Sequence, residues 1–157
     1  MSETIRFRVY GIPQTKGSAK AFMRPGMRFP VVMNDNVKNK AWAQSVSLAS
    51  QQHRIPGCPF KGPMGLTLNF ILPAPQSLPK TKPSFATKRP DLDKMVRSIK
   101  DALKGVFYQD DSQVVSLQTI KTYGLEPGVL IVVEPITLNH NGWAALAYHP
   151  SRLKRGE

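Results

Sequence analysis

Cysteine, histidine and acidic residues are all scarce in this chain of 157 residues. The single cysteine, Cys58, cannot form an internal disulfide, which is typical of a protein from a reducing compartment. Three histidines without the spacing of metal ligands, and no cysteine pair, argue against a zinc site. No apolar run approaches the ~18 residues of a membrane-spanning helix, and the N-terminal residues carry no secretory signal. We therefore expect a cytoplasmic protein.

The shortage of acids leaves a strongly basic chain. Twenty-two Lys and Arg residues against ten Asp and Glu give a net charge of +12. A soluble chain of this charge usually binds a polyanion, most commonly a nucleic acid. A basic surface without such a partner is the alternative that composition alone leaves open.

Hydrophobic patterning predicts one α+β domain with a mixed sheet of about four to five strands and two main helices. The first helix follows Asn34 or Asp35 and runs to about His53, and Gly105 ends the second. In the second helix an apolar stripe recurs at helical spacing: Leu92, Met95, Val96, Ile99, Leu103 and Val106. The strands are expected at residues 5–10, 30–33, 64–72, 114–123 and 129–136, with the last two joined as a hairpin. Residues 1–136 form this domain, and residues 137–157 form a basic tail without a clear period.

Two segments rich in proline, glycine and basic residues read as loops, at residues 13–30 and 73–90. Basic side chains in such loops are suited to contact a DNA backbone. The candidates are Lys16, Lys20, Arg24, Arg28, Lys80, Lys82, Lys88 and Arg89.

Five of the ten acids fall between residues 91 and 111: Asp91, Asp93, Asp101, Asp110 and Asp111. A protein that binds phosphates has little reason to gather carboxylates unless a cation joins them, and a divalent ion inverts the local electrostatics. Hard oxygen ligands of this kind suit Mg²⁺ or Mn²⁺. The cluster therefore predicts a metal-dependent phosphodiester site.

Each part of this cluster also has a purely structural interpretation. Asp91 can cap the helix, and Asp93, Arg97 and Asp101 can form a ladder of surface ion pairs. Asp110 and Asp111 can belong to a polar turn. The second helix is about 21 Å long, and five or six extended residues after Gly105 run back about 17–20 Å. The loop length therefore permits Asp110 or Asp111 to reach the start of the helix.

The segment from Arg89 to Val115 resembles the RusA family of Holliday-junction resolvases. The resemblance is carried by a DLD start, a helix that ends in DAL, and a DD-x-QVV strand, and it is specific over roughly residues 88–123. It implies a homodimeric endonuclease, bacterial or phage-encoded, that cuts branched double-stranded DNA with divalent metal, Mg²⁺ with Mn²⁺ as a possible substitute. The implied metal ligands are Asp91, Asp93 and Asp111, with Asp110 adjacent.

Two positions depart from the family pattern. A lysine that the family often has one helical turn past the second acid is Arg97 here, and the usual asparagine after that acid is Lys94. Arginine keeps the charge and can bind phosphate in a bidentate manner, but it cannot donate a proton in the same way. Asp101 is expected to orient Arg97.

The hypothesis is that Asp91, Asp93 and Asp111 hold one or two metal ions that activate water for hydrolysis, while Arg97 neutralises the scissile phosphate. Two alternatives remain open. One is a non-catalytic nucleic-acid-binding protein, although aromatic residues at base-stacking spacing are lacking. The other is a related nuclease that prefers flaps or forks.

Overall fold

The computed structural model describes residues 3–17, 19–22, 25–26, 28–29, 31–34, 37–79, 82–138 and 144–145, with only the backbone at 19–22, 31–34, 37 and 144–145. The predicted α+β class, with two helices and a mixed five-stranded sheet, is confirmed. The elements are β1 (Ile5–Tyr10), β2 (Ala19–Phe22), β3 (Val31–Asn34), α1 (Val37–Gln52), β4 (Met64–Pro73), β5 (Ser84–Phe85), α2 (Leu92–Leu103), the 3₁₀ turn η1 (Asp111–Gln113), β6 (Val114–Gly124), β7 (Gly128–Pro135), β8 (Thr137–Leu138) and β9 (Ala144–Ala145).

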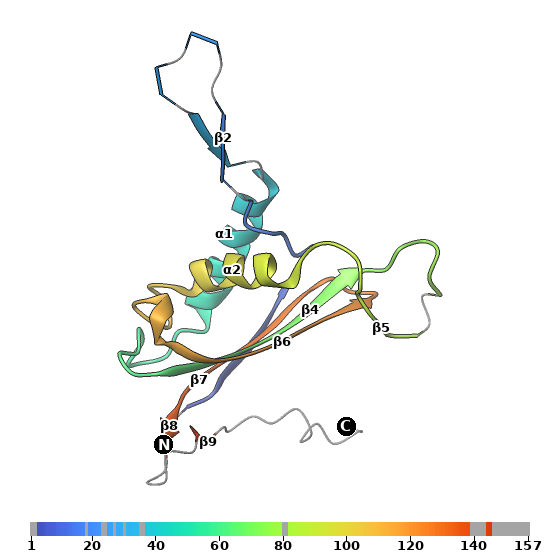
Figure 1. The fold of residues 1–157 in the computed structure, drawn as a ribbon. Coiled ribbons are helices and arrows are strands. Elements are labelled where there is room, and N and C mark those ends of the chain that lie inside the picture. The colour runs from blue at the N-terminus through green and yellow to red at the C-terminus, as the bar shows by residue number, and fades with distance from the viewer. Residues whose placement is uncertain are drawn as a thin grey trace.

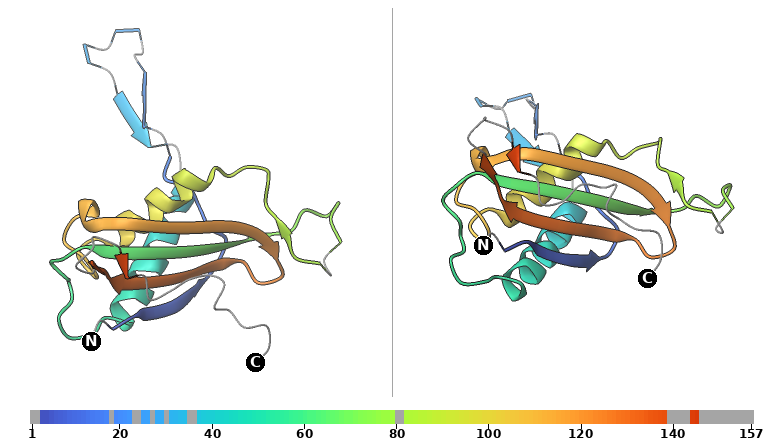
Figure 2. Two further views of the ribbon diagram at one scale, coloured as in Figure 1. Left: turned by 60° about the horizontal axis from the view of Figure 1, so that its bottom comes forward. Right: turned by 90° about the horizontal axis from the view of Figure 1, so that it is seen from below.

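The sheet has the strand order β1-β7-β4-β6-β5, and β4 runs parallel to β6 and antiparallel to β7. Both helices cover the same face of the sheet (Figures 1 and 2). On that face, Leu66, Leu68 and Phe70 of the central strand are buried completely or nearly so, because they alternate along β4 toward the helices. The core therefore lies between β4 and its neighbours on one side and the two helices on the other.

The hairpin expected from the last two strands is wrong. Strand β4 lies between β6 and β7 and pairs with both along most of its length. The link between Gly124 and Gly128 crosses over the end of β4, a span of about 10 Å, or two strand spacings. Because β4 is buried on both faces over most of its length, it takes the central place that a direct hairpin would have denied it.

The other predicted elements are found close to their expected positions, with additional short strands. Figure 1 shows β2 and β3, which pair as an antiparallel hairpin, standing away from the sheet and helices. The sequence predicted β3 but read the residues of β2 as loop, and it likewise missed β5 in the second loop. Part of the predicted tail pairs as β8 with β9, and most of the rest lies outside the described residues. No helix in the described part of the chain has the length and apolar character to cross a membrane.

Helix α2 follows its predicted stripe. Met95, Val96, Ile99 and Leu103 are buried, and Gly105 adopts a φ of 81°, a left-handed conformation that ends helices and favours glycine. The chain does not then run straight back along the helix. The Gly105 N–H donates to the Tyr108 carbonyl over 2.7 Å, so the chain first closes a tight turn. This turn shortens the reach of the residues that follow it.

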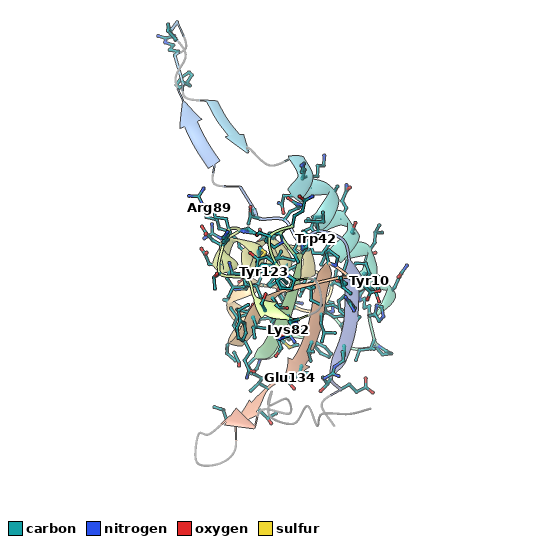
Figure 3. The ribbon with its side chains drawn as sticks, turned by 90° about the vertical axis from the view of Figure 1, so that its right-hand side faces the viewer. Tyr10, Trp42, Lys82, Arg89, Tyr123 and Glu134 are labelled. Atoms are coloured by element: carbon teal, nitrogen blue, oxygen red, sulfur yellow. The ribbon has the colours of Figure 1, made fainter. Side chains whose placement is uncertain are left out.

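Glu134 on β7 is a buried acid on the face of the sheet opposite the helices. It is 4% exposed and pairs in register with Gly65, and its Oε2 has no hydrogen-bond partner among the described residues. Burial raises the pKa of Glu134 above its ordinary value, because the charged form loses its hydration. Figure 3 places it near the end of the sheet that lies away from Arg89.

We predict that Glu134→Gln stabilises the protein once the pH exceeds the ordinary pKa of a glutamate, about 4.3. A carboxyl group whose pKa is raised in the fold costs stability once the pH exceeds its unfolded pKa, and the cost grows until the folded pKa is passed. The amide carries no charge and escapes this cost. Thermal unfolding of both proteins from about pH 4 to about pH 8 should show an advantage of the variant that widens with pH. An advantage that stays constant across this range would contradict the assignment.

Candidate active site

Helix α2 begins at a loop that is tied to the sheet. Lys121 of β6 donates from its Nζ to the carbonyls of Lys88 and Pro90, both over 2.8 Å. Asp91 occupies the N-cap position but its side chain makes no capping hydrogen bond; its Oδ2 lies 3.3 Å from Lys94 Nζ. Asp91 therefore occupies the N-cap position that the sequence predicted, but its side chain does not cap the helix. Its carboxylate pairs with a neighbouring cation.

One side of α2 presents Asp93, Arg97 and Lys100 to a pocket of about 640 Å³, and Asp111 lies in the wall of the same pocket. These three helix positions are spaced four and then three residues apart, so they stay within about 60° of one another around the helix. Two of the predicted ligands, Asp93 and Asp111, are thus brought together with the predicted phosphate-binding Arg97.

Asp101 does not belong to this group. Its carboxylate forms an ion pair with Lys16 Nζ, and within the described residues no ion pair joins it to Arg97. Eight residues past Asp93, it has drifted about 80° around the helix, which turns it away from the pocket. The expectation that Asp101 orients Arg97 is wrong.

The turn before β6 is built around two side chains. Asp110 Oδ1 accepts a hydrogen bond from the Ser112 backbone N–H over 2.9 Å, and Lys104 Nζ lies 3.3 Å from its Oδ2. The Ser112 N–H, and then Lys104, lower the pKa of Asp110 to about 2. Asp110 is therefore a capping residue of η1 and does not line the pocket, so the turn interpretation holds for this acid.

Gln113 fixes the same turn from its other end. Its Oε1 accepts hydrogen bonds from the backbone N–H groups of Gln109 and Asp110, over 2.7 and 2.9 Å. Its Nε2 donates to the carbonyls of Phe60 and Gly62, over 2.8 and 3.0 Å. One side chain thus clamps the residues before Asp111 to a distant loop and sets where Asp111 lies.

Asp111 differs from the other four acids of the cluster in having a buried oxygen without a partner among the described residues. Its Oδ1 is shielded from solvent and accepts no hydrogen bond within the described residues. The neighbouring Tyr108 hydroxyl donates instead to the Lys100 carbonyl over 2.8 Å. Burial, and then the negative charges of Asp111 and Asp101, raise the pKa of Tyr108 far above its ordinary value, so this phenol stays neutral. Burying a carboxylate oxygen without a hydrogen-bond partner costs free energy unless a bound ligand supplies the missing partner.

These residues fit a magnesium ion of the kind held by one or two carboxylates together with substrate phosphates. Asp93 and Asp111 supply hard oxygen donors, and the unpaired Oδ1 of Asp111 is a donor without a competing partner. Within the described residues, no three His, Cys, Asp or Glu side chains gather closely enough to enclose a metal on their own. Asp91 lines the adjacent pocket, together with Arg89 and Lys94.

The predicted DNA-contacting residues are spread over several places. Lys16 is engaged with Asp101, Arg28 is exposed, and Arg89 lines the pocket next to Asp91, with its side chain pointing outward in Figure 3. Lys82 belongs to a separate pocket beside the last residues of β4 and β6, and the Lys88 carbonyl accepts from Lys121. The side chain of Lys20 is not described, and Arg24 and Lys80 lie outside the described residues.

Four residues of the site were not predicted from the sequence: Gln113, Lys100, Leu117 and Thr119. A signal existed for Lys100, because it stands seven residues past Asp93 and three past Arg97, which places all three on one side of the helix. For Leu117 and Thr119 there was none, because they reach the pocket only through the parallel pairing of β6 with β4.

A basic chain that sets two carboxylates and two cations around one pocket has the features of an enzyme that acts on a phosphate polymer. Residues 14–134 match the sequence profile of the family described as "Endodeoxyribonuclease RusA". The chain belongs to this family of endodeoxyribonucleases. It is also 34% identical over 144 residues to the uncharacterized protein YqaN of Bacillus subtilis (strain 168), a similarity that covers 86% of this chain and 99% of that protein.

We predict that Gln113→Ala destabilises the protein, because four backbone groups lose their partner at once. At the usual value for each hydrogen bond, the free energy of unfolding should fall by about 2–6 kcal/mol. Gln118→Ala is the matched control, since it changes the same residue type on β6 where no side-chain bond of this kind is present among the described residues. Equal denaturation midpoints for the two variants would show that the clamp is unimportant.

Proposed function

We propose that this protein is a Mg²⁺-dependent endodeoxyribonuclease that resolves four-way and related branched DNA junctions by hydrolysing phosphodiester bonds, acting as a homodimer. The observation that supports the chemistry best is the single pocket lined by Asp93, Asp111, Arg97 and Lys100, in which Asp111 carries an Oδ1 without a hydrogen-bond partner among the described residues. Family membership supports the DNA substrate. The preference for branches rests on the family alone.

Asp93 and Asp111 would hold the metal ion, with Asp91 as a third carboxylate once phosphate or metal draws it away from Lys94. Asp110 stays in its capping role beside them. When bound, Mg²⁺ supplies a lowered pKa for the attacking water and positive charge beside the leaving 3′ oxygen. Mn²⁺ has the same preference for oxygen ligands and should substitute.

Arg97 and Lys100 together take the two roles, phosphate binding and proton donation, that a single lysine could fill. The Arg97 guanidinium binds two oxygens of the scissile phosphate and holds it against the acids. Lys100 lies one helical turn further on and faces the same pocket. Unlike arginine, an ammonium group can give a proton to the leaving oxygen. The arginine at position 97 therefore does not remove the proton donor from the site.

Basic side chains outside the pocket would position the DNA without reading its sequence. Arg89 and Arg28 are described and accessible, and Lys82 and Lys88 lie on the segment that leads to α2. Branch selectivity would follow from the spacing of two active sites in a dimer and from DNA shape.

We predict that Asp93→Asn and Asp111→Asn each slow the cleavage of a synthetic four-way junction in Mg²⁺ at least about a hundredfold, while junction binding persists. Binding persists because each change removes a negative charge that repels phosphate. Glu126→Gln is the matched control, since Glu126 pairs with Arg8 beside a separate pocket and is 71% exposed at its side chain. Full activity of either Asn variant would refute the site.

The same assay separates the two alternatives. A non-catalytic binding protein would bind the junction without cutting it at any Mg²⁺ concentration. A flap- or fork-preferring nuclease would cut those substrates faster than the four-way junction, and the Asn variants would lose that activity in parallel.

We also predict that Mg²⁺ or Mn²⁺ raises the temperature of thermal unfolding in the absence of DNA. A ligand that binds only the folded state stabilises it by mass action. The shift should vanish in the double variant Asp93→Asn, Asp111→Asn and remain in Glu126→Gln. An equal shift in all three proteins would place the metal elsewhere.

A further inference from the structure

Half of the active-site pocket has no part in binding metal or phosphate. Next to Asp93, Arg97, Lys100 and Asp111, the pocket is lined by Leu92, Val96, Leu117 and Thr119. Three of these four side chains are aliphatic. A site that held only a metal ion and a phosphate would gain nothing from an apolar wall.

Leu117 is the most open part of this wall, with 46% of its surface exposed. It lies on the helix-covered face of the sheet, in register with Leu66, which is only 2% exposed. The helices thus cover Leu66 of β4 more completely than Leu117 of β6. Among the described residues β5 pairs with Thr122 and Tyr123 of β6, so the Leu117 part of β6 lies at the edge of the sheet. The side of the pocket formed by β6 is therefore open to solvent beside α2.

Thr119 adds a polar group to the apolar half. Its Oγ1 is shielded from solvent and has no hydrogen-bond partner within the described residues. The hydroxyl can both donate and accept. Two residues that line the pocket thus each carry a buried oxygen without a partner among the described residues, Asp111 Oδ1 in the charged half and Thr119 Oγ1 in the apolar half.

The charges along α2 also mark this pocket. Lys16, Lys94 and Lys104 are each paired with an aspartate. Arg97 and Lys100, the two cations that line the pocket, form no side-chain ion pair or hydrogen bond with any other described residue. Of the described cations on α2, those left for an outside anion are therefore the two next to the apolar wall.

We propose that this apolar half holds an unstacked nucleobase, that of a nucleotide flanking the scissile phosphate, with Thr119 Oγ1 on a polar edge of the base. This assignment rests on the proposed function. A phosphate on Arg97 and Lys100 carries its own sugar and base into the adjoining space, and aliphatic side chains with one hydrogen-bonding group suit a base. In continuous duplex the base stays stacked, and taking it out costs free energy. That cost is smallest at a branch point, where stacking is already interrupted.

The test pairs a change in the protein with a change in the DNA. The scissile phosphate is first mapped on a four-way junction, and each flanking nucleotide is then replaced in turn by an abasic one. At one of the two positions the abasic substrate should be cut about tenfold more slowly by the unaltered protein. Leu117→Ala should slow cleavage of the intact junction about tenfold and leave the abasic one unaffected, because the lost contact is then already absent. Thr119→Val should act in the same way.

The control variant is Ile120→Ala. Ile120 is 40% exposed on the same strand but lies on the opposite face of the sheet, so its removal should change neither rate. A second measurement does not depend on cleavage. With 2-aminopurine at the sensitive position, binding of Asp111→Asn should raise the fluorescence as the base leaves its stack, and adding Leu117→Ala should reduce that rise.

Three outcomes would overturn the proposal. Equal cleavage of intact and abasic junctions would leave the nuclease assignment standing and remove the base site. A loss of cleavage in Leu117→Ala that is equal on both substrates, together with weaker self-association in sedimentation, would assign the wall to a second copy of the chain. No cleavage of any branched substrate would overturn the proposed function itself, and this assignment with it.

Discussion

The packing of α2 against the sheet is the constraint on which the site depends. Met95, Ile99 and Leu103 are completely buried on one side of this helix, and each would leave a cavity costing about 2–5 kcal/mol if truncated to alanine. Because these residues fix the rotation of the helix about its axis, the residues about a third of a turn away are fixed as well. Asp93 and Arg97 face the pocket for this reason, and a shift of one residue would turn them away.

The opposite wall of the pocket is set by hydrogen bonds rather than by apolar packing. Gln113 binds the backbone on both sides of a gap of about fifty residues in sequence. Lys121 Nζ binds the carbonyls of Lys88 and Pro90 and so ties the loop before α2 to β6. Several charged side chains nearby form ion pairs that hold these segments, as in the pairs Lys16–Asp101 and Lys104–Asp110. Among the described residues that line the pocket, Asp93, Arg97 and Lys100 form no ion pair and Asp111 Oδ1 accepts no hydrogen bond, which is a suitable arrangement for a ligand that brings both a metal ion and phosphate.

The sequence was sufficient to predict the parts that local patterns encode. Hydrophobic periodicity predicts the apolar stripe of α2, the end of that helix at Gly105, and the strands β1 and β7. The crowding of five acids in a basic chain predicts the acids of the site. Strand order does not follow, because nothing in the residues of β6 and β7 signals that β4 inserts between them. That insertion brings Leu117 and Thr119 to the pocket, so the sequence predicted its charged half and missed its apolar half. Asp101 was misplaced because a spacing of eight residues drifts from the helix face that a spacing of four or seven shares.

The central claim is that Asp93 and Asp111 lie across one pocket in order to hold a divalent ion. Crystals grown with Mn²⁺ and a DNA junction, with the ion located by its anomalous scattering, test this most directly. The account predicts the strongest peak between these two carboxylates, with Arg97 on the adjoining phosphate and Asp110 still bound to Ser112. A peak coordinated by other residues, or a phosphate bound without any ion at these two acids, would contradict it.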